Sequence, residues 1–199
     1  MAKVRPHRSS PSLDMTPMVD LAFLLVTFFM LTTKFAADEP VPVDTPSSVS
    51  EIKIPDTDIL TIMVSKEGRV YFNMDGQYNR AELLVAMGQK YGVEFDQTEQ
   101  HSFAVISSSV GVPMGSMKQF LDLGPEDRKH VEQMGIPVDS LHNELAEWVL
   151  NARLTNRKLR IAIKGDSQSD YPTIKKVIKT LLDRKVNRFN LITNMEKPS

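Results

Sequence analysis

A single acidic residue, Asp20, interrupts the most apolar stretch of this sequence. Residues 15–33 read MTPMVDLAFLLVTFFMLTT, and Asp20 is the only charged residue among them. At roughly 1.5 Å per residue, a helix of this length approaches the ~30 Å thickness of a bilayer's hydrocarbon core. An ionised carboxylate costs about 2.5–3.5 kcal/mol to place there, so it is usually retained for a function. We therefore expect Asp20 to hold or exchange a proton within a transmembrane helix.

Polar residues near Asp20 fall on the same side of the expected helix. At 100° per residue, Thr16, Asp20, Thr27 and Lys34 lie within about 40° of one another, as a narrow stripe that should face a protein or a hydrated cavity. Pro17 suits the first turn of a helix. Simpler interpretations remain open: Asp20 reaches water near the cytoplasmic interface, Thr27 bonds its own backbone one turn back, and Lys34 extends to the far interface.

The apolar block admits three structural interpretations. A cleavable signal peptide also begins with basic residues, but an acid within its apolar region is disfavoured and KFAADE offers no clear cleavage site. A buried helix of a soluble protein is disfavoured because LAFLLVTFFML is apolar on every side. A retained membrane anchor is favoured. Lys3, Arg5 and Arg8 precede the block, so the positive-inside rule places the N-terminus in the cytoplasm and exports the rest.

The remaining composition excludes several functional classes. The 199-residue chain has a formal net charge of −1, which gives no indication of nucleic-acid binding. It contains no cysteine, and its four histidines have no metal-binding spacing. Residues 164–170, KGDSQSD, are explained as a loop that caps a helix rather than as a cation or phosphate site. We expect no enzyme activity, no cofactor and no metal.

Several segments together resemble one known family. Leu13-Asp14-Met15-Thr16-Pro17-Met18-Val19-Asp20-Leu21, followed by AFLLVTFFML, is similar to the N-terminal motif of the ExbD/TolR family of biopolymer transport proteins. IKIP (52–55), LTIMVSKEGRVYFN (60–73) and LRIAIKGDSQSDYPTIKKVIKTLLDRKVNRFNLIT (159–193) continue the resemblance. These segments cover about half of the chain. Residues 87–143 depart from the family pattern, because they separate parts that are normally close together.

The resemblance implies a function and a set of partners. A pair of such helices, from two copies of the chain, would sit within a channel of ExbB/TolQ-like subunits in the bacterial inner membrane. Proton flow past Asp20 would drive a TonB- or TolA-like envelope-spanning protein. The resemblance carries over only Asp20, with Thr16 and Pro17 as the motif that positions it; the polar stripe adds Thr27 as a supporting residue. Which branch of the family this is, and what it transports, does not follow from the sequence.

The domain organisation follows from these segments. We expect a cytoplasmic N-terminus (1–14), a transmembrane helix (15–36), a proline-rich, solvated periplasmic linker (37–58) and a periplasmic domain (59–195) with an insertion at about 87–143. Ile52 and Ile54 in the linker could form an edge strand. The fold class is a single transmembrane helix plus a small two-layer α+β domain, with about four strands, helices on one face and a helical insertion.

Local patterns predict the elements of the exported domain. A hairpin at 60–65 and 69–73 precedes a helix at 79–90 capped by Asn79, and a capping box spans 96–99. Helical turns follow at 116–122 and 125–133, then a helix at 141–154 capped by Asp139 or Ser140. A strand at 159–164, a helix at 171–185 capped by Asp170 and a strand at 188–193 complete the domain. Trp148 is expected in the core, and the lysines of the last helix are expected to form a solvated face.

Two functional hypotheses from different classes result. The first is a subunit that couples the proton motive force to work in the envelope through Asp20. The second is a membrane-anchored periplasmic protein-binding module whose anchor only localises it. The polar stripe favours the first, since a plain anchor needs none.

Overall fold

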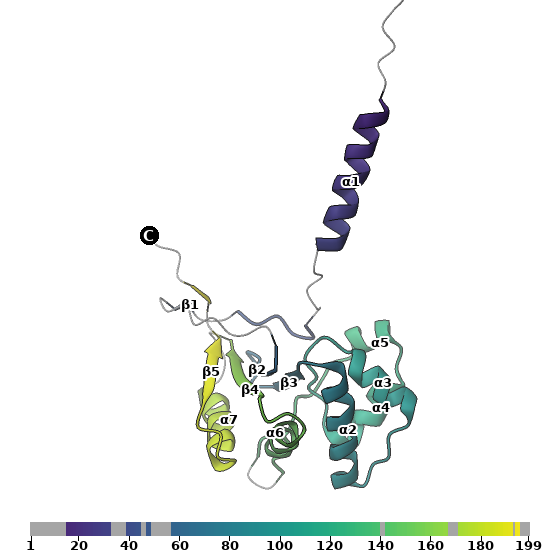
Figure 1. Cartoon of the computed structure of the whole chain (residues 1–199). Coiled ribbons are helices and arrows are strands. Elements are labelled where there is room, and N and C mark those ends of the chain that lie inside the picture. The colour runs from purple at the N-terminus through teal and green to yellow at the C-terminus, as the bar shows by residue number, and fades with distance from the viewer. Residues whose placement is uncertain are drawn as a thin grey trace, which may run out of the picture. The chain divides into compact units, whose positions relative to one another are not determined.

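The computed structural model describes residues 15–32, 39–44, 47–48, 57–139, 142–166, 171–192 and 194–195. The chain divides into two compact units, Met1–Ala36 and Ala37–Ser199. The first unit contains helix α1 (Thr16–Thr32), and the second contains the sheets and the other helices (Figure 1).

A four-stranded sheet forms the framework of the C-terminal unit. Its strands are β2 (Ile59–Val64), β3 (Val70–Met74), β4 (Arg160–Gly165) and β5 (Phe189–Ile192), in the order β3-β2-β4-β5. The hairpin strands β2 and β3 are antiparallel, whereas β2–β4 and β4–β5 are parallel and therefore need crossover connections. The four predicted strands are confirmed. A separate pair, β1 (Ser47–Ser48) and β6 (Asn194–Met195), is parallel.

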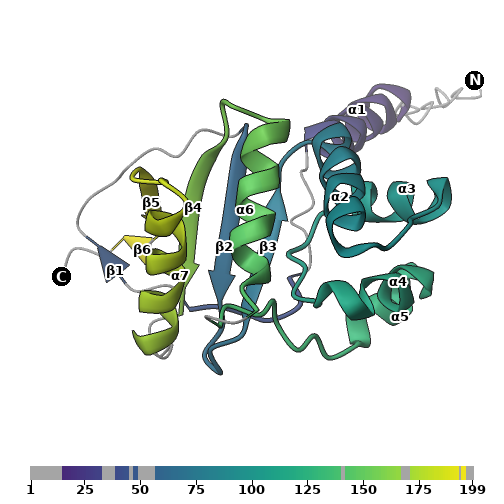
Figure 2. The same ribbon diagram turned by 90° about the horizontal axis from the view of Figure 1, so that it is seen from below.

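The helices of the C-terminal unit lie on one face of this sheet and beyond its β3 edge (Figure 2). They are α2 (Gln77–Tyr91), α3 (Gln97–Val105), α4 (Met114–Asp122), α5 (Pro125–His130), α6 (Glu144–Thr155) and α7 (Tyr171–Asp183). Helices α6 and α7 lie across the face of the sheet, with α2 beside α6 and with α3 to α5 beyond the β3 side (Figure 2). The predicted two-layer arrangement is thus present in the C-terminal unit.

Trp148 of α6 joins several elements in one hydrophobic core. Its side chain is 1% exposed. Its ring centre lies 5.1 Å from that of Phe72 on β3 and 6.0 Å from that of Phe103 on α3. The prediction of a core tryptophan is confirmed. Phe103, Met114 and Phe120 are buried in this same core. Helices α3 and α4 therefore contribute side chains to the core of the unit.

The outer edge of β3 is closed by chain segments from the 87–143 region. Phe72 and Val110 exchange both backbone hydrogen bonds, at 2.9 and 2.7 Å, and Ile136 N donates to Val70 O at 2.8 Å. Gly111 lies so close to the Tyr71 ring that a Cβ atom built there would come within 2.4 Å of it. An unpaired strand edge invites pairing with another chain, and these segments remove that opportunity at β3.

The predicted helix caps were correct for α3 and incorrect for α2 and α6. Asp96 and Glu99 form the expected reciprocal capping box on α3. Helix α2 instead follows Gly76, so Asn79 lies within the first turn and does not cap it. Helix α6 is capped by Asn143, which accepts from Ala146 N at 2.9 Å. Asp139 does not cap α6, since the N-cap lies four residues further along the chain at Asn143, which also forms an antiparallel bridge with Val138.

Two residues of the described linker segment, 39–44, hydrogen-bond to later parts of the C-terminal unit. The carboxylate of Glu39 accepts from Ser109 N at 2.8 Å, and Asp44 N donates to the carboxylate of Asp166 at 3.0 Å. These two contacts tie Glu39 and Asp44 to the domain. The predicted strand residues Ile52 and Ile54, Lys34 of the polar stripe, and the predicted caps Ser140 and Asp170 lie outside the described residues.

Candidate functional site

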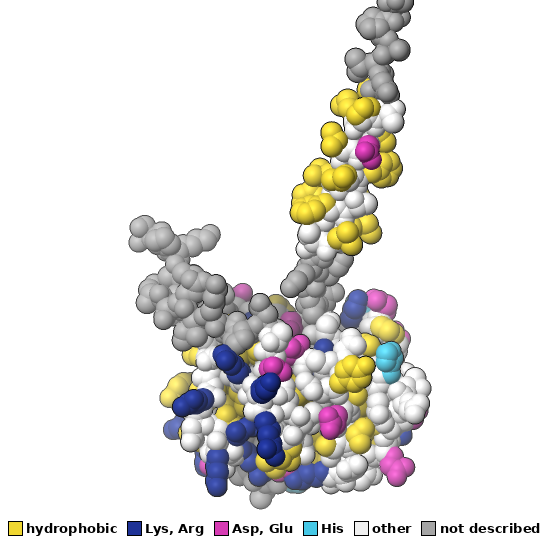
Figure 3. All heavy atoms as spheres, viewed as in Figure 1, with side chains coloured by type: hydrophobic (Ala, Val, Ile, Leu, Met, Phe, Trp, Pro, Cys, Tyr) yellow, Lys and Arg dark blue, Asp and Glu magenta, His cyan; other side chains and the backbone are white. Residues whose placement is uncertain are grey.

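Helix α1 presents its apolar side chains on its surface. None of its residues is buried, and Phe23, Leu25 and Phe28 are each more than half exposed. Hydrophobic side chains cover the described part of the helix in the space-filling view, with one acid among them (Figure 3). An exposed apolar surface of this kind marks a region that meets a protein partner or lipid.

Asp20 lies within this apolar surface, one helical turn after Thr16. It is the only charged residue between Thr16 and Thr32, and it lies in the first half of the helix. Pro17 occupies the second helical position, where its missing N–H costs little. The α-helical geometry places Thr16, Asp20 and Thr27 on one side, as the sequence predicted. The site residues thus share one element and one face.

Thr27 uses its hydroxyl within its own helix. Its Oγ1 lies 2.9 Å from both Phe23 O and Leu24 O, in the preceding turn. Thr32 makes the same kind of bond to Phe28 O at 2.8 Å, although it lies on a different side of the helix. Since this bond forms irrespective of the stripe, it satisfies the Thr27 donor without any partner outside α1.

The described ranges contain no helix that is both long and apolar enough to cross a membrane.

These ranges also contain no group of three or more His, Cys, Asp or Glu residues arranged to hold a metal.

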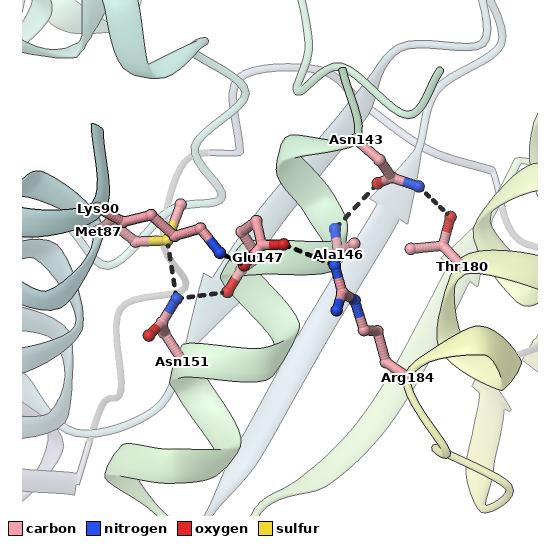
Figure 4. A network of polar contacts seen from close by, with 8 residues as sticks. All are labelled: Met87, Lys90, Asn143, Ala146, Glu147, Asn151, Thr180 and Arg184. Atoms are coloured by element: carbon pink, nitrogen blue, oxygen red, sulfur yellow. Dashed lines mark hydrogen bonds and ion pairs between the residues drawn. The ribbon is translucent and has the colours of Figure 1, made fainter. Parts of the chain in front are cut away.

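The C-terminal unit contains a polar row on α6 that sequence reasoning missed. Asn143, Glu147 and Asn151 follow one another at intervals of four residues and so share a face of the helix. The Glu147 carboxylate pairs with Lys90 of α2 on one side and with Arg184 of α7, at 2.6 Å, on the other (Figure 4). The interval of four is the signal that could have revealed this row.

The ends of the same row strengthen both connections. Asn143 donates to the Thr180 hydroxyl of α7 at 2.8 Å, and Asn151 lies 3.5 Å from the sulfur of Met87 on α2 (Figure 4). Glu147 is largely buried, with 14% of its side chain exposed, so its two cationic partners offset the cost of burying its charge. Helix α6 is therefore linked by polar contacts to its neighbours on both sides.

Tyr71 provides a buried titratable group on the β3 side of the unit. Its side chain is 0% exposed, and its hydroxyl lies 3.5 Å from Gln133 O. Burial raises the pKa of Tyr71, and the nearby Arg69 partly opposes that shift. The charged phenolate is disfavoured in this position.

One comparison with known proteins identifies the family. The family model described as biopolymer transport protein ExbD/TolR matches residues 6–196. The chain belongs to the ExbD/TolR family. Comparison with curated proteins and with solved structures gave no match.

Membership of the ExbD/TolR family places the chain among biopolymer transport proteins. The matched range includes both α1 and the whole of the four-stranded sheet. The family model therefore covers elements of both units. It also includes residues 87–143, the region that closes the β3 edge and contributes Phe103 to the core.

Proposed function

We propose that this ExbD/TolR protein is the energy-transducing subunit of a proton-driven motor in the bacterial inner membrane. In this proposal residues 15–36 cross the membrane once, with the N-terminus in the cytoplasm and the domain from residue 59 in the periplasm. The single observation that carries it is one acid, Asp20, on an otherwise apolar helix whose side chains are all exposed. At 1.5 Å per residue, α1 extends for about 26 Å, shorter than the ~30 Å hydrocarbon core of a bilayer, so the proposed span also requires the residues that flank it.

Asp20 is the proposed proton carrier. Its uptake of a proton would neutralise the only charge on α1, and release would restore it. A proton that moves through about 100 mV contributes about 2.3 kcal/mol, enough to change a two-state equilibrium roughly fiftyfold. Thr16 and Pro17 would fix the start of the helix around Asp20, while the self-bonded Thr27 would have only an accessory role.

The proposed partners follow from the family. The polar side of α1 would face ExbB/TolQ-like channel subunits and a second copy of α1, because an acid that faces lipid would remain unsatisfied. The periplasmic domain would transmit the change to a TonB- or TolA-like envelope-spanning protein. The motor could serve outer-membrane uptake or envelope maintenance.

The decisive experiment replaces Asp20 with Asn and, as a matched control, with Glu. Asp20→Asn should reduce proton-driven outer-membrane uptake and envelope integrity to the level of a deletion strain. Asp20→Glu should retain measurable activity, because it keeps an ionisable carboxyl group. Membrane insertion and co-purification of the channel subunits should be unchanged in both variants.

The two outcomes distinguish the motor from its rival. If the Asn variant retained full function in both assays, the proton-carrier mechanism would be wrong and the chain would be better described as an anchored binding module.

A further inference from the structure

An open cavity of about 670 Å³ lies where the end of α6, the start of β4 and the connection from α7 to β5 meet. Cationic side chains from each of these segments line it, namely Arg153, Arg160, Lys185 and Arg188, and no acidic residue does. This accumulation occurs in a chain whose formal net charge is −1. Lys and Arg side chains gather on the side of the unit that carries α7 and β5 (Figure 3).

The cations of this cavity lack the acidic partners that other cations of the unit have. Arg69 pairs with Glu132 at 2.6 Å, Lys176 with Asp139 at 3.4 Å, and Arg184 with Glu147. No ion pair or side-chain hydrogen bond joins the four cavity cations to another residue within the described ranges. Four cations that share one cavity without counter-charges repel one another, and an anionic ligand would relieve that repulsion.

Helix dipoles explain only part of this arrangement. Arg153 and Lys185 lie at the C-terminal ends of α6 and α7, where a positive charge is favourable. Arg160 begins a strand and Arg188 lies in a loop, so this explanation does not apply to them. Lys185 also adopts a φ of 59°, at a position following a helix where glycine or asparagine is usual. The sequence thus keeps a cationic side chain at a position where the backbone disfavours one.

The remaining lining favours an extended ligand over a compact anion. Leu159 and Phe189 are partly buried and provide apolar surface, and Asn187 and Asn190 provide amide groups that can both donate and accept. An adjoining cavity of about 340 Å³ shares Arg153 and adds Arg157 beside the exposed Leu154. A compact phosphate is usually held by converging backbone N–H groups at a helix N-terminus, whereas this site lies at two C-termini.

We propose that the two joined cavities bind an extended acidic peptide segment of a partner protein. Carboxylates of the peptide pair with Arg153, Arg160 and Arg188, in the planar two-bond geometry that suits guanidinium groups. Apolar side chains between those carboxylates contact Leu159 and Phe189. The amide side chains of Asn187 and Asn190 form hydrogen bonds with the backbone of the peptide.

Peptide binding can be measured on the full chain in detergent solution, without a proton gradient. One fluorescent probe is a peptide of alternating Glu and Leu, and its control carries Gln in place of every Glu. Fluorescence anisotropy should give a Kd for the Glu peptide at least tenfold lower than for the Gln peptide. The preference should shrink as salt is raised, because the interaction is between partly exposed charges.

Two double variants of equal charge locate the site. Arg153→Gln with Arg188→Gln should raise the Kd of the Glu peptide at least tenfold. Lys175→Gln with Lys179→Gln removes two exposed α7 charges outside the cavities and should change it less than twofold. If both pairs of substitutions raised the Kd equally, the peptide would be bound by non-specific electrostatic attraction to the surface, and the proposal would be wrong.

A charge reversal separates recognition from loss of folding. Arg153→Glu with Arg188→Glu leaves the cavity without net positive charge and should lose the Glu peptide, while the circular dichroism spectrum stays that of the unmodified chain. Asp20→Asn should bind the Glu peptide like the unmodified chain, so failure here is distinguishable from failure of the proton mechanism. If phosphatidylglycerol vesicles bound at these arginines while the Glu peptide did not, the ligand would be a lipid surface and the proposal would be wrong.

Discussion

Apolar residues have opposite fates in the two units of this chain. In α1 they are exposed along the whole helix, and none of its residues is buried. In the C-terminal unit they form a core in which Leu60, Trp148 and Leu181 are at most 1% exposed. The sheet and its helices bury their apolar surface against one another, which supports independent folding. Helix α1 would need a lipid or protein environment to bury its apolar side chains in the same way.

The comparison can be tested most strongly by exchanging α1. A span of Leu and Ala replacing residues 15–34 should anchor the chain but abolish proton-driven function, because it lacks the carboxyl group. The same span with Asp20 retained should recover part of that function. The measurements are outer-membrane uptake in cells and membrane fractionation of each variant. If the plain Leu/Ala span kept full function, α1 would act only as a membrane anchor.

The second test removes the centre of the buried unit. Trp148→Ala should lower the free energy of unfolding of the C-terminal unit by about 3–5 kcal/mol, because it leaves a cavity between Phe72 and Phe103. Denaturant titration of the full chain in detergent, followed by circular dichroism, measures it. Trp148→Phe should cost less than half as much, since most of the ring volume remains. Equal losses for the two variants would contradict the packing explanation.

A smaller loss is expected at the polar row of α6. Glu147→Gln removes the charge that links Lys90 to Arg184 and should lower the free energy of unfolding by about 1–2 kcal/mol. Glu126→Gln, at an exposed pair with Lys129, is the matched control and should cost less than about 0.5 kcal/mol. Both values come from the same denaturant titration. Similar decreases in the free energy of unfolding for the two variants would mean that the burial of Glu147 does not strengthen its ion pairs.

The smallest effect concerns alkaline pH. Because burial raises the pKa of Tyr71 in the folded state, the unfolded chain releases this proton first, near the ordinary tyrosine value of 10.0. The contribution of the neutral phenol to stability is therefore complete below about pH 10 and is lost as pH rises through the higher folded pKa. The midpoint temperature of thermal unfolding should fall less steeply between pH 8 and pH 11 in Tyr71→Phe than in the unmodified chain. Identical slopes in the two proteins would show that Tyr71 does not titrate differently on folding.

Local patterns predicted the elements whose cause is local. The hairpin of β2 and β3 and the capping box at Asp96 depend on residues within a few positions of one another. The capping box was predicted correctly, and the two strands were predicted to within one residue of their bounds. The predicted caps of α2 and α6 were wrong. Helix α2 follows Gly76, which offers no capping side chain, and α6 is capped by Asn143. Asn, Asp and Ser are all favourable capping residues, so the local pattern did not choose between Asn143 and the earlier Asp139 and Ser140.

The candidate site divides in the same way. Asp20 was found from sequence because one charge in an apolar block is a composition signal, and its role remains a proposal. The Glu147 row and the cationic cavity were not found, since their partners come from helices far apart in the chain. Arg153 and Arg188 look like ordinary surface residues until β4 and the α7–β5 connection bring them together.

The sequence by itself determined an apolar segment with one acid, the four strands and the family to which the chain belongs. Hydrophobic periodicity and motif spacing are properties of consecutive residues, so they can be read without a fold. Only the tertiary structure decided the strand order β3-β2-β4-β5, the closure of the β3 edge and the grouping of unpaired cations beside β5. Those features depend on which distant segments pack together, which no local pattern specifies.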